Sequence, residues 1–219
     1  MTTLKKELIR EYKELDSCTL SDAFDELNLK QGGCILPKQM LKSTTICGQV
    51  FTVKYVLKNG NESKFGTFLD DIPTDRIVVI DNQGRIDGSV WGDTMALYAQ
   101  KNGAGGAVLN GVYRDVGPIQ DLGFPVFAKG CSSKSGKELV RVEATNVAIE
   151  MDNVLIEPDD LIFGDESGVI VIPFEHVEIV LNKAKELKRI DARFVENLAN
   201  GLSYKEAKTK ANDRSLKDE

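Results

Sequence analysis

Two apolar segments flank a helical segment in the middle of the chain, and this order limits the possible folds more than any other feature of the sequence. Arg76–Asp81 (RIVVID) has an apolar centre of four residues, which is typical of a buried strand. Gly92–Asn102 (GDTMALYAQKN) has apolar residues at helical spacing, and Gly106–Asn110 (GAVLN) is a second apolar run. Pro125–Lys129 predicts a further strand. Strand, helix and strand in this order predict a right-handed crossover and an α/β fold with a layered core.

The second half of the chain is richer in short β-like segments. Turn signals separate four of them: Leu139–Ala148, Ile149–Ile156, Asp160–Phe163 and Val169–Ile172. Upstream, Thr44–Val56 is rich in β-branched residues and predicts a strand or a bent strand pair, with Gly48 as the candidate bulge. Asn82–Gly84 predicts a turn directly after the first buried strand.

Helices are expected on both sides of this core. The expected segments are Leu4–Leu15, which ends at Asp16 and Ser17; Asp22–Leu27, capped by Thr19 or Ser21; Phe174–Asn200, which ends at Gly201; and Ser203–Lys210. The charged tail that follows is expected to fray. Because no repeat or linker interrupts the chain, we expect one domain over residues 1–219.

The composition argues against several classes of protein. Of the 219 residues, 28 are Lys or Arg and 34 are Asp or Glu, and a net charge of −6 disfavours a large nucleic-acid-binding surface. The N-terminal segment lacks the apolar stretch of a signal peptide, and no apolar run is long enough to cross a membrane. The four cysteines, Cys18, Cys34, Cys47 and Cys131, form no CxxC or metal-ligand spacing, so we expect free thiols and a cytoplasmic protein.

A polar pair follows the Gly106–Asn110 strand, at Arg114 and Asp115. The ends of buried strands in α/β proteins open into crevices where ligands bind. The planar guanidinium of Arg114 suits a carboxylate or an oxyanion, and the carboxylate of Asp115 suits a divalent cation such as magnesium. An Arg beside an Asp after a strand is also a common surface salt bridge, so spacing alone leaves both interpretations open.

The helix that starts at Gly92 supplies a second half of the candidate site. The amides of its first turn, Gly92 through Met95, can bind an anion with help from the helix dipole, and Gly92 permits close approach. Together these groups could hold a small 2-oxo acid. The helix amides would bind its carboxylate, Arg114 its keto oxygen, and a metal on Asp115 both groups. Asp93, in the first turn, could equally be only a favourable partner of the helix dipole.

The chain around these residues resembles the RraA-like family. The family hallmark is an acidic residue, twenty intervening residues and then Arg-Asp, which Asp93 and Arg114-Asp115 match. Four flanking segments are similar as well: Leu20–Ala23, Gly48–Val53, Leu122–Phe127 and Gly164–Pro173. The resemblance covers roughly positions 17 to 200, and its long spaced motif is specific to the family but not to one activity.

The resemblance implies an α/β/β fold of the swivelling-domain type and a homotrimer, sometimes a pair of trimers, with sites between subunits. It also implies a metal-dependent class II aldolase that cleaves 4-hydroxy-2-oxo diacids, such as 4-hydroxy-4-methyl-2-oxoglutarate, or decarboxylates oxaloacetate, to pyruvate through a metal-stabilised enolate. Arg114 would polarise the keto oxygen, Asp115 would bind Mg²⁺ or Mn²⁺, and Asp93 would hold a metal-bound water. The amides of Gly92, Thr94 and Met95 would bind the carboxylate of the 2-oxo acid.

Some features of the family remain open in this chain. Active aldolases also use an acidic residue from the C-terminal helix of the neighbouring subunit, for which Asp191 and Glu186 are the nearest matches. Glu150–Asn153 and Pro158–Asp160 depart from the usual glycine-containing patterns, which affects substrate choice more than fold. The alternative function is that of a non-catalytic regulator that binds a ribonuclease and inhibits it. The single histidine, His176, lies far from any nucleophile pattern, so Ser-His or Cys-His catalysis is not expected.

Overall fold

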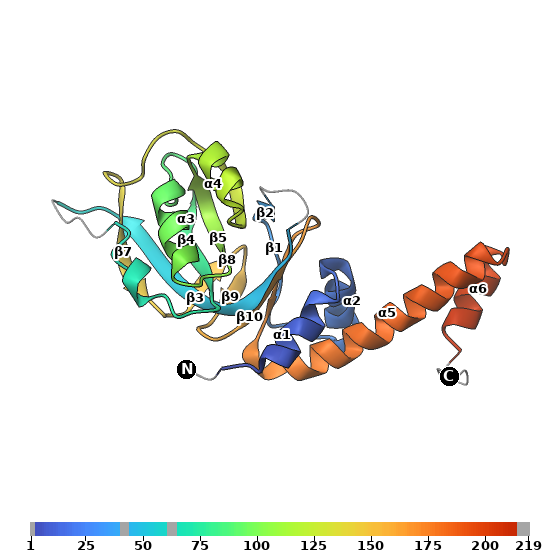
Figure 1. Cartoon of the computed structure of the whole chain (residues 1–219). Helices are drawn as coiled ribbons and strands as arrows, with labels where there is room; N and C mark the ends of the chain where they lie inside the picture. Colours follow the sequence, from blue (N-terminus) through green and yellow to red (C-terminus); the bar gives the residue numbers. More distant parts are fainter. Residues whose placement is uncertain (1–2, 40–43, 61–64, 214–219) are drawn as a thin grey trace.

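A mixed β-sheet of nine strands runs through the protein in the computed structural model, which describes residues 3–39, 44–60 and 65–213 (Figure 1). Four neighbouring strands at its centre are parallel: β3 (Ile46–Leu57), β4 (Ile77–Arg85), β5 (Gly106–Tyr113) and β6 (Val126–Cys131). Antiparallel strands extend one side in the order β10 (Leu161–Gly164), β11 (Val169–Ile172) and β1 (Gly33–Ile35). The remaining strands are β2 (Lys38–Gln39), on β6, and β7 (Val140–Thr145), on β3.

The parallel strands are covered on both faces. Helices α3 (Asp93–Lys101) and α4 (Val116–Leu122) lie on one face, and the hairpin of β8 (Ile149–Met151) and β9 (Val154–Ile156) lies on the other (Figure 1). Alternate residues of β4 pack against the helices and against the hairpin, because successive side chains of a strand point to opposite faces of the sheet. Ile80 packs in the cluster beneath α3, and Val79 packs in the cluster beneath the hairpin. This arrangement confirms the predicted α/β/β layers.

The antiparallel strands are covered by helices from both ends of the chain. These are α1 (Lys6–Lys13), α2 (Ser17–Leu27) and α5 (Val177–Ala199), whose buried side chains form one cluster with β10 and β11. A 3-10 turn, Phe174–His176, leads into α5, and another, Leu69–Asp71, precedes β4. Helix α5 projects beyond the sheet, and α6 (Tyr204–Ala211) folds back against its far end (Figure 1). The predicted flanking helices are therefore confirmed.

Helix α2 begins five residues before the predicted start at Asp22. Asp16 caps it, because the Asp16 side chain accepts a hydrogen bond from the Thr19 amide at 2.8 Å. The prediction that Thr19 or Ser21 caps this helix is wrong, since both residues lie inside it. A short chain segment between two helices offers several capping side chains, and the sequence pattern alone selected the wrong one.

The strands also differ from prediction in three places. Thr44–Val56 contains one strand, β3, whose register shifts at Lys54/Tyr55 and not at Gly48. The predicted turn at Asn82–Gly84 lies inside β4 as a bulge, since Gln83 and Gly84 have positive φ and the pairing with β5 resumes at Arg85. The run over 149–156 is a hairpin, whose turn residues Asp152 and Asn153 have φ of 53° and 66°.

Helix α4 was not predicted at all. It is a short helix of seven residues that follows Asp115 and ends at Gly123, a glycine with φ of 68°. The charged tail that was expected to fray falls mostly at residues 214–219, which lie outside the described residues. Within the described part of the chain, no helix combines the length and apolar character that crossing a membrane requires.

A buried hydrogen-bond pair fastens the start of α2 to the turn between β10 and β11. Asp165 accepts from the Ser17 amide at 2.8 Å and from the Ser17 hydroxyl at 2.6 Å. Burial alone would raise the pKa of the Asp165 carboxyl, but these hydrogen bonds and those from the Ser167 and Gly168 amides lower it below its usual value. Asp165 is therefore held as a carboxylate under α2.

We expect Ser17→Ala to lower the free energy of unfolding by about 2 kcal/mol, because it removes a hydrogen bond to a buried charged group. The control is Ser21→Ala on the same helix, whose hydroxyl only accepts a weak, exposed contact from Cys34, and which should change stability by less than about 0.5 kcal/mol. Urea denaturation of both variants measures the difference. Equal stabilities would show that the Asp165 contact does not anchor α2.

Candidate functional site

A cavity of about 300 Å³ lies beside the carboxyl end of β5 and the start of α3. It brings together all six residues that the sequence singled out: Gly92, Asp93, Thr94, Met95, Arg114 and Asp115. The rest of its lining comes from three other segments and consists of Phe65, Gly66, Leu69, Ser89, Trp91, Ser135 and Lys137. The lining of the cavity therefore combines polar and apolar side chains.

Backbone hydrogen bonds hold the segment before α3 against the end of β5. The Arg114 amide donates to the Trp91 carbonyl at 3.0 Å, and the Val90 amide donates to the Val112 carbonyl at 3.1 Å. The Trp91 side chain is only 1% exposed and stacks on Phe124, with ring centroids 5.9 Å apart. These contacts fix where α3 begins relative to Arg114.

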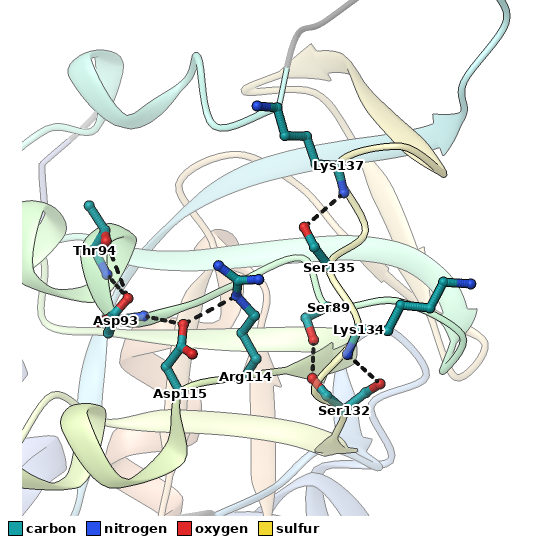
Figure 2. Close-up of polar contacts among 9 residues, drawn as sticks. All are labelled: Ser89, Asp93, Thr94, Arg114, Asp115, Ser132, Lys134, Ser135 and Lys137. Carbon is teal, nitrogen blue, oxygen red and sulfur yellow. Dashed lines mark hydrogen bonds and ion pairs between the residues drawn. The ribbon is translucent and has the colours of Figure 1, made fainter.

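Arg114, Asp115 and Asp93 form a connected polar group (Figure 2). Oδ2 of Asp115 lies 3.2 Å from Nε of Arg114 and accepts from the Asp93 amide at 3.4 Å. Figure 2 shows the two terminal nitrogens of Arg114 pointing away from Asp115, so they remain available to a ligand. Asp115 has φ of 58° and is the N-cap residue of α4, which turns the chain sharply out of the strand.

Gly92 is required at this point by space and not by its backbone conformation, which is extended. A Cβ on Gly92 would lie 2.8 Å from Oδ2 of Asp115 and 3.5 Å from Nε of Arg114. Any larger residue would therefore force the Asp115 carboxylate to shift. The predicted role of Gly92 in close approach has a physical basis, although the first group that approaches is the protein's own Asp115.

The amides at the start of α3 are partly occupied. Oδ1 of Asp93 accepts from the Thr94 amide at 2.6 Å and from the Thr94 hydroxyl at 3.2 Å (Figure 2). The Asp93 amide is engaged by Asp115. Within the described residues, the amides of Gly92 and Met95 have no hydrogen-bond partner. A ligand carboxylate would therefore meet two open amides and would compete with Asp93 at Thr94.

The donor set of the cavity fits a hard divalent cation. Its acidic residues are Asp93 and Asp115, and neither an imidazole nor a thiol lines it. Mg²⁺ is commonly held by one or two carboxylates, with waters and substrate oxygens as the other ligands, whereas zinc prefers histidine and cysteine. Among the described residues, no group of three or more His, Cys, Asp and Glu side chains could hold a metal ion by itself. A cation here would thus depend on additional ligands.

The two acidic residues considered for the neighbouring subunit lie on α5 and not in this cavity. Glu186 accepts a hydrogen bond from Nζ of Lys183 at 2.8 Å. Asp191 lies close enough to Asp22 of α2 for the two charges to interact. The pKa of the Asp22 carboxyl is raised, first by the partial burial of Asp22 and then by the negative charge of Asp191. Whether either residue completes a second subunit's site remains a prediction.

The loop after β6 contributes residues that the sequence did not single out, above all Ser135 and Lys137. Ser89 pairs with Ser135, and the Ser89 amide donates to the Lys134 carbonyl at 2.8 Å, so the loop crosses the cavity edge beside Arg114 (Figure 2). The sequence did contain a signal from which a role of this loop in the site could have been predicted. Residues 132–137 (SSKSGK) follow a strand that neighbours β5, and parallel neighbours end at the same sheet edge.

Comparison with known proteins identifies the family. The family model described as "RraA-like: Aldolase/RraA" matches residues 17–171. Protein DlpA of Legionella pneumophila is 31% identical over 204 residues, which cover 92% of this chain but only 33% of that protein. The chain thus spans about a third of the length of this relative.

Two further proteins match along nearly their whole length. A protein of Halalkalibacterium halodurans named "Putative 4-hydroxy-4-methyl-2-oxoglutarate aldolase" is 31% identical over 192 residues, covering 87% of this chain and 88% of its own. The solved structure of an uncharacterised protein from Pseudomonas syringae pv. tomato has a TM-score of 0.90 at 30% identity and covers 95% of this chain and 96% of its own. The chain belongs to the RraA-like family.

We expect Gly92→Ala to disrupt the site without unfolding the protein, because its Cβ would displace the Asp115 carboxylate. The matched control is Gly117→Ala in α4, where an added Cβ would meet nothing within 4 Å. The sequence predicts that this site binds Mn²⁺ and pyruvate, and this predicted binding, measured by calorimetry, should be weaker by about tenfold or more in the first variant only. Equal binding by both variants would mean that the close approach of Gly92 and Asp115 has no role in the site.

Proposed function

We propose that this chain is a carbon–carbon lyase that cleaves 4-hydroxy-2-oxo diacids, such as 4-hydroxy-4-methyl-2-oxoglutarate, to pyruvate and also decarboxylates oxaloacetate. The observation that carries the proposal is the convergence of Arg114, Asp115 and the first turn of α3 on one cavity. The aldolase name of a relative that matches over most of both chains supports the same reaction class.

The cavity has suitable groups for each part of such a substrate. Its volume of about 300 Å³ lies at the small end of ligand pockets and fits a short diacid. The open amides of Gly92 and Met95 would bind the carboxylate next to the keto group, and Arg114 the keto oxygen. Lys137 lines the same cavity and, among the described residues, forms no ion pair. Its ammonium would bind the distal carboxylate.

Both proposed reactions break a bond to C3 and leave its electron pair on the pyruvate fragment as an enolate. The terminal nitrogens of Arg114 would donate hydrogen bonds to the oxygen on which that charge develops. A divalent cation held by Asp115, Mg²⁺ or Mn²⁺, would supply Lewis acidity to the same oxygen. Asp115 also holds Nε of Arg114, so one side chain would orient the guanidinium and ligate the cation.

The two reactions differ in their need for a base. Retro-aldol cleavage requires removal of the proton from the C4 hydroxyl before the C3–C4 bond breaks, whereas loss of CO₂ from oxaloacetate requires no such step. Asp93 lies in the cavity with one carboxylate oxygen bound by Thr94. Its carboxylate would orient the water that accepts this proton. Asp93 is therefore assigned to the aldol reaction in particular.

Replacing Arg114 tests the proposal most directly. Arg114→Lys keeps the charge but loses the planar fork, and we expect the kcat of pyruvate release to fall by about 100-fold. Arg114→Ala and Asp115→Ala should abolish turnover and leave the fold intact. Pyruvate release is measured from both substrates, with Mg²⁺ and with a chelator, beside a protein-free reaction that corrects for decarboxylation by free metal.

The matched control for Arg114 is Lys134→Ala, which removes a cation of the adjacent loop; Lys134 itself does not line the cavity. This variant should retain wild-type activity. Activity in Arg114→Ala, or wild-type turnover that persists in chelator, would contradict the assigned site. No turnover above the protein-free reaction with either substrate would favour the alternative of a non-catalytic regulator, tested by binding to purified RNA-degrading enzyme.

Asp93→Asn separates the two reactions. We expect it to lower kcat for the 4-hydroxy-2-oxo diacid by about 100-fold and to change oxaloacetate decarboxylation by less than about tenfold, because only the first reaction needs a base. The ratio of the two rates in one preparation is the readout, so loss of folded protein cancels. An equal loss of both activities would assign Asp93 to binding instead of proton transfer.

The proposal includes a homotrimer, or a pair of trimers, in which Asp191 or Glu186 of α5 reaches a neighbouring site. The position of both residues outside the cavity of their own chain is compatible with this role.

A further inference from the structure

A second cavity, of about 420 Å³, lies between α2 and the edge strand β1, on elements that do not line the first one. Two of the four cysteines line it, Cys18 from α2 and Cys34 from β1. Both thiols are exposed. The other lining residues include Ser21, Asp22, Lys38 and Ser167.

Ser21 lies between the two cysteines in the lining of this cavity. The Cys34 thiol donates to the Ser21 hydroxyl, with sulfur and oxygen 3.7 Å apart. Cys18 precedes Ser21 by three residues in α2, and side chains at this spacing are neighbours on one helix face, with Cβ atoms about 5–6 Å apart. Cys18 and Cys34 thus both adjoin Ser21 and line the same cavity.

Hydrogen bonds hold the start of α2, whereas β1 is a short strand at the edge of the sheet. Ser17, next to Cys18, is held by Asp165 through both its amide and its hydroxyl. By contrast, β1 has three residues and ends the sheet, where it pairs with β11. It begins at Gly33, a glycine with φ of 114° and no atom within 4 Å of an added Cβ. A disulfide needs a Cα separation of about 4.4–6.8 Å, and any adjustment that it requires would fall on β1 and Gly33.

The remaining cysteines lie in different environments. Cys47 is buried in β3, and burial raises the pKa of its thiol to about 12, which suppresses the reactive thiolate. Cys131 is exposed at the end of β6 and does not line the second cavity. Cys131 therefore serves as an internal comparison, as an exposed cysteine outside this cavity.

The geometry points to Cys18 and Cys34 as a reversible disulfide pair that forms when the protein meets a peroxide. One thiol loses its proton, and its thiolate attacks an oxygen of hydrogen peroxide. The O–O bond breaks, a sulfenic acid forms, and the leaving hydroxide takes up the proton as water. The second thiol then attacks the sulfenic sulfur, the S–S bond forms and a second water leaves. Two thiols are oxidised and one peroxide is reduced. A dithiol or thioredoxin-type reductant restores the thiols.

The disulfide would clamp the edge strand onto α2. It would close a loop of 15 intervening residues, from Thr19 to Gly33, and restrict the unfolded chain. It would also covalently join two of the elements that line the second cavity. The inference does not rest on the proposed lyase activity, because neither cysteine lines the first cavity.

The test uses the full-length protein, reduced and desalted, then treated with a small excess of hydrogen peroxide. Digestion under non-reducing conditions and mass spectrometry should find the Cys18–Cys34 linked peptide, and thiol titration of the denatured protein should fall by two. The oxidised protein should melt higher by on the order of 5 °C, and dithiothreitol should reverse the shift.

Three variants complete the test. Cys18→Ser and Cys34→Ser should each lose the linked peptide and the melting shift, whereas Cys131→Ser should keep both. The inference is overturned if the wild-type chain shows no linked peptide under conditions that oxidise Cys131. It is also overturned if Cys18 and Cys34 end as separate sulfinic acids or as disulfides between chains.

Discussion

The hydrogen bond from the Arg114 amide to the Trp91 carbonyl is the contact on which the rest of the site depends. It ties the segment that starts α3 to the residues that follow β5, although the whole of α3 and β5 separates the two residues in the sequence. With this contact in place, Gly92 lies against the Asp115 carboxylate, and Asp115 accepts from the Asp93 amide and contacts Arg114. The polar group is therefore assembled by backbone geometry before any ligand binds. Preorganisation of this kind is what electrostatic stabilisation of developing charge requires.

At the start of α3, carboxylates of the protein itself bind two of the backbone amides. The Thr94 amide is bound by the carboxylate of Asp93, and the Asp93 amide is bound by Asp115. An incoming carboxylate would exchange one charge-assisted hydrogen bond for another at Thr94, so little free energy is gained there. In the proposed site, discrimination between ligands would then come from the Gly92 and Met95 amides and from the cations Arg114 and Lys137.

Elements marked by a local sequence pattern were predicted, whereas residues positioned by contacts between distant segments were missed. The α3 segment and the Arg114-Asp115 pair were found because helical spacing, an apolar strand and a spaced family motif mark them within a few dozen residues. Lys137 and Ser135 were missed because their place beside Arg114 arises from the pairing of Ser89 with Ser135, across a loop with no periodic pattern. The bulge at Gln83 was mistaken for a turn because positive φ at successive residues occurs in both.

Trp91 is the only tryptophan of the chain, and it lies in the wall of the first cavity. Its indole is buried against Phe124, and its ring nitrogen has no hydrogen-bond partner within the described residues. The fluorescence of the whole protein therefore originates largely from one ring at the candidate site. Ligand occupancy, metal loading and movement of the α3 start would all be visible as changes in a single emission band, with no label attached.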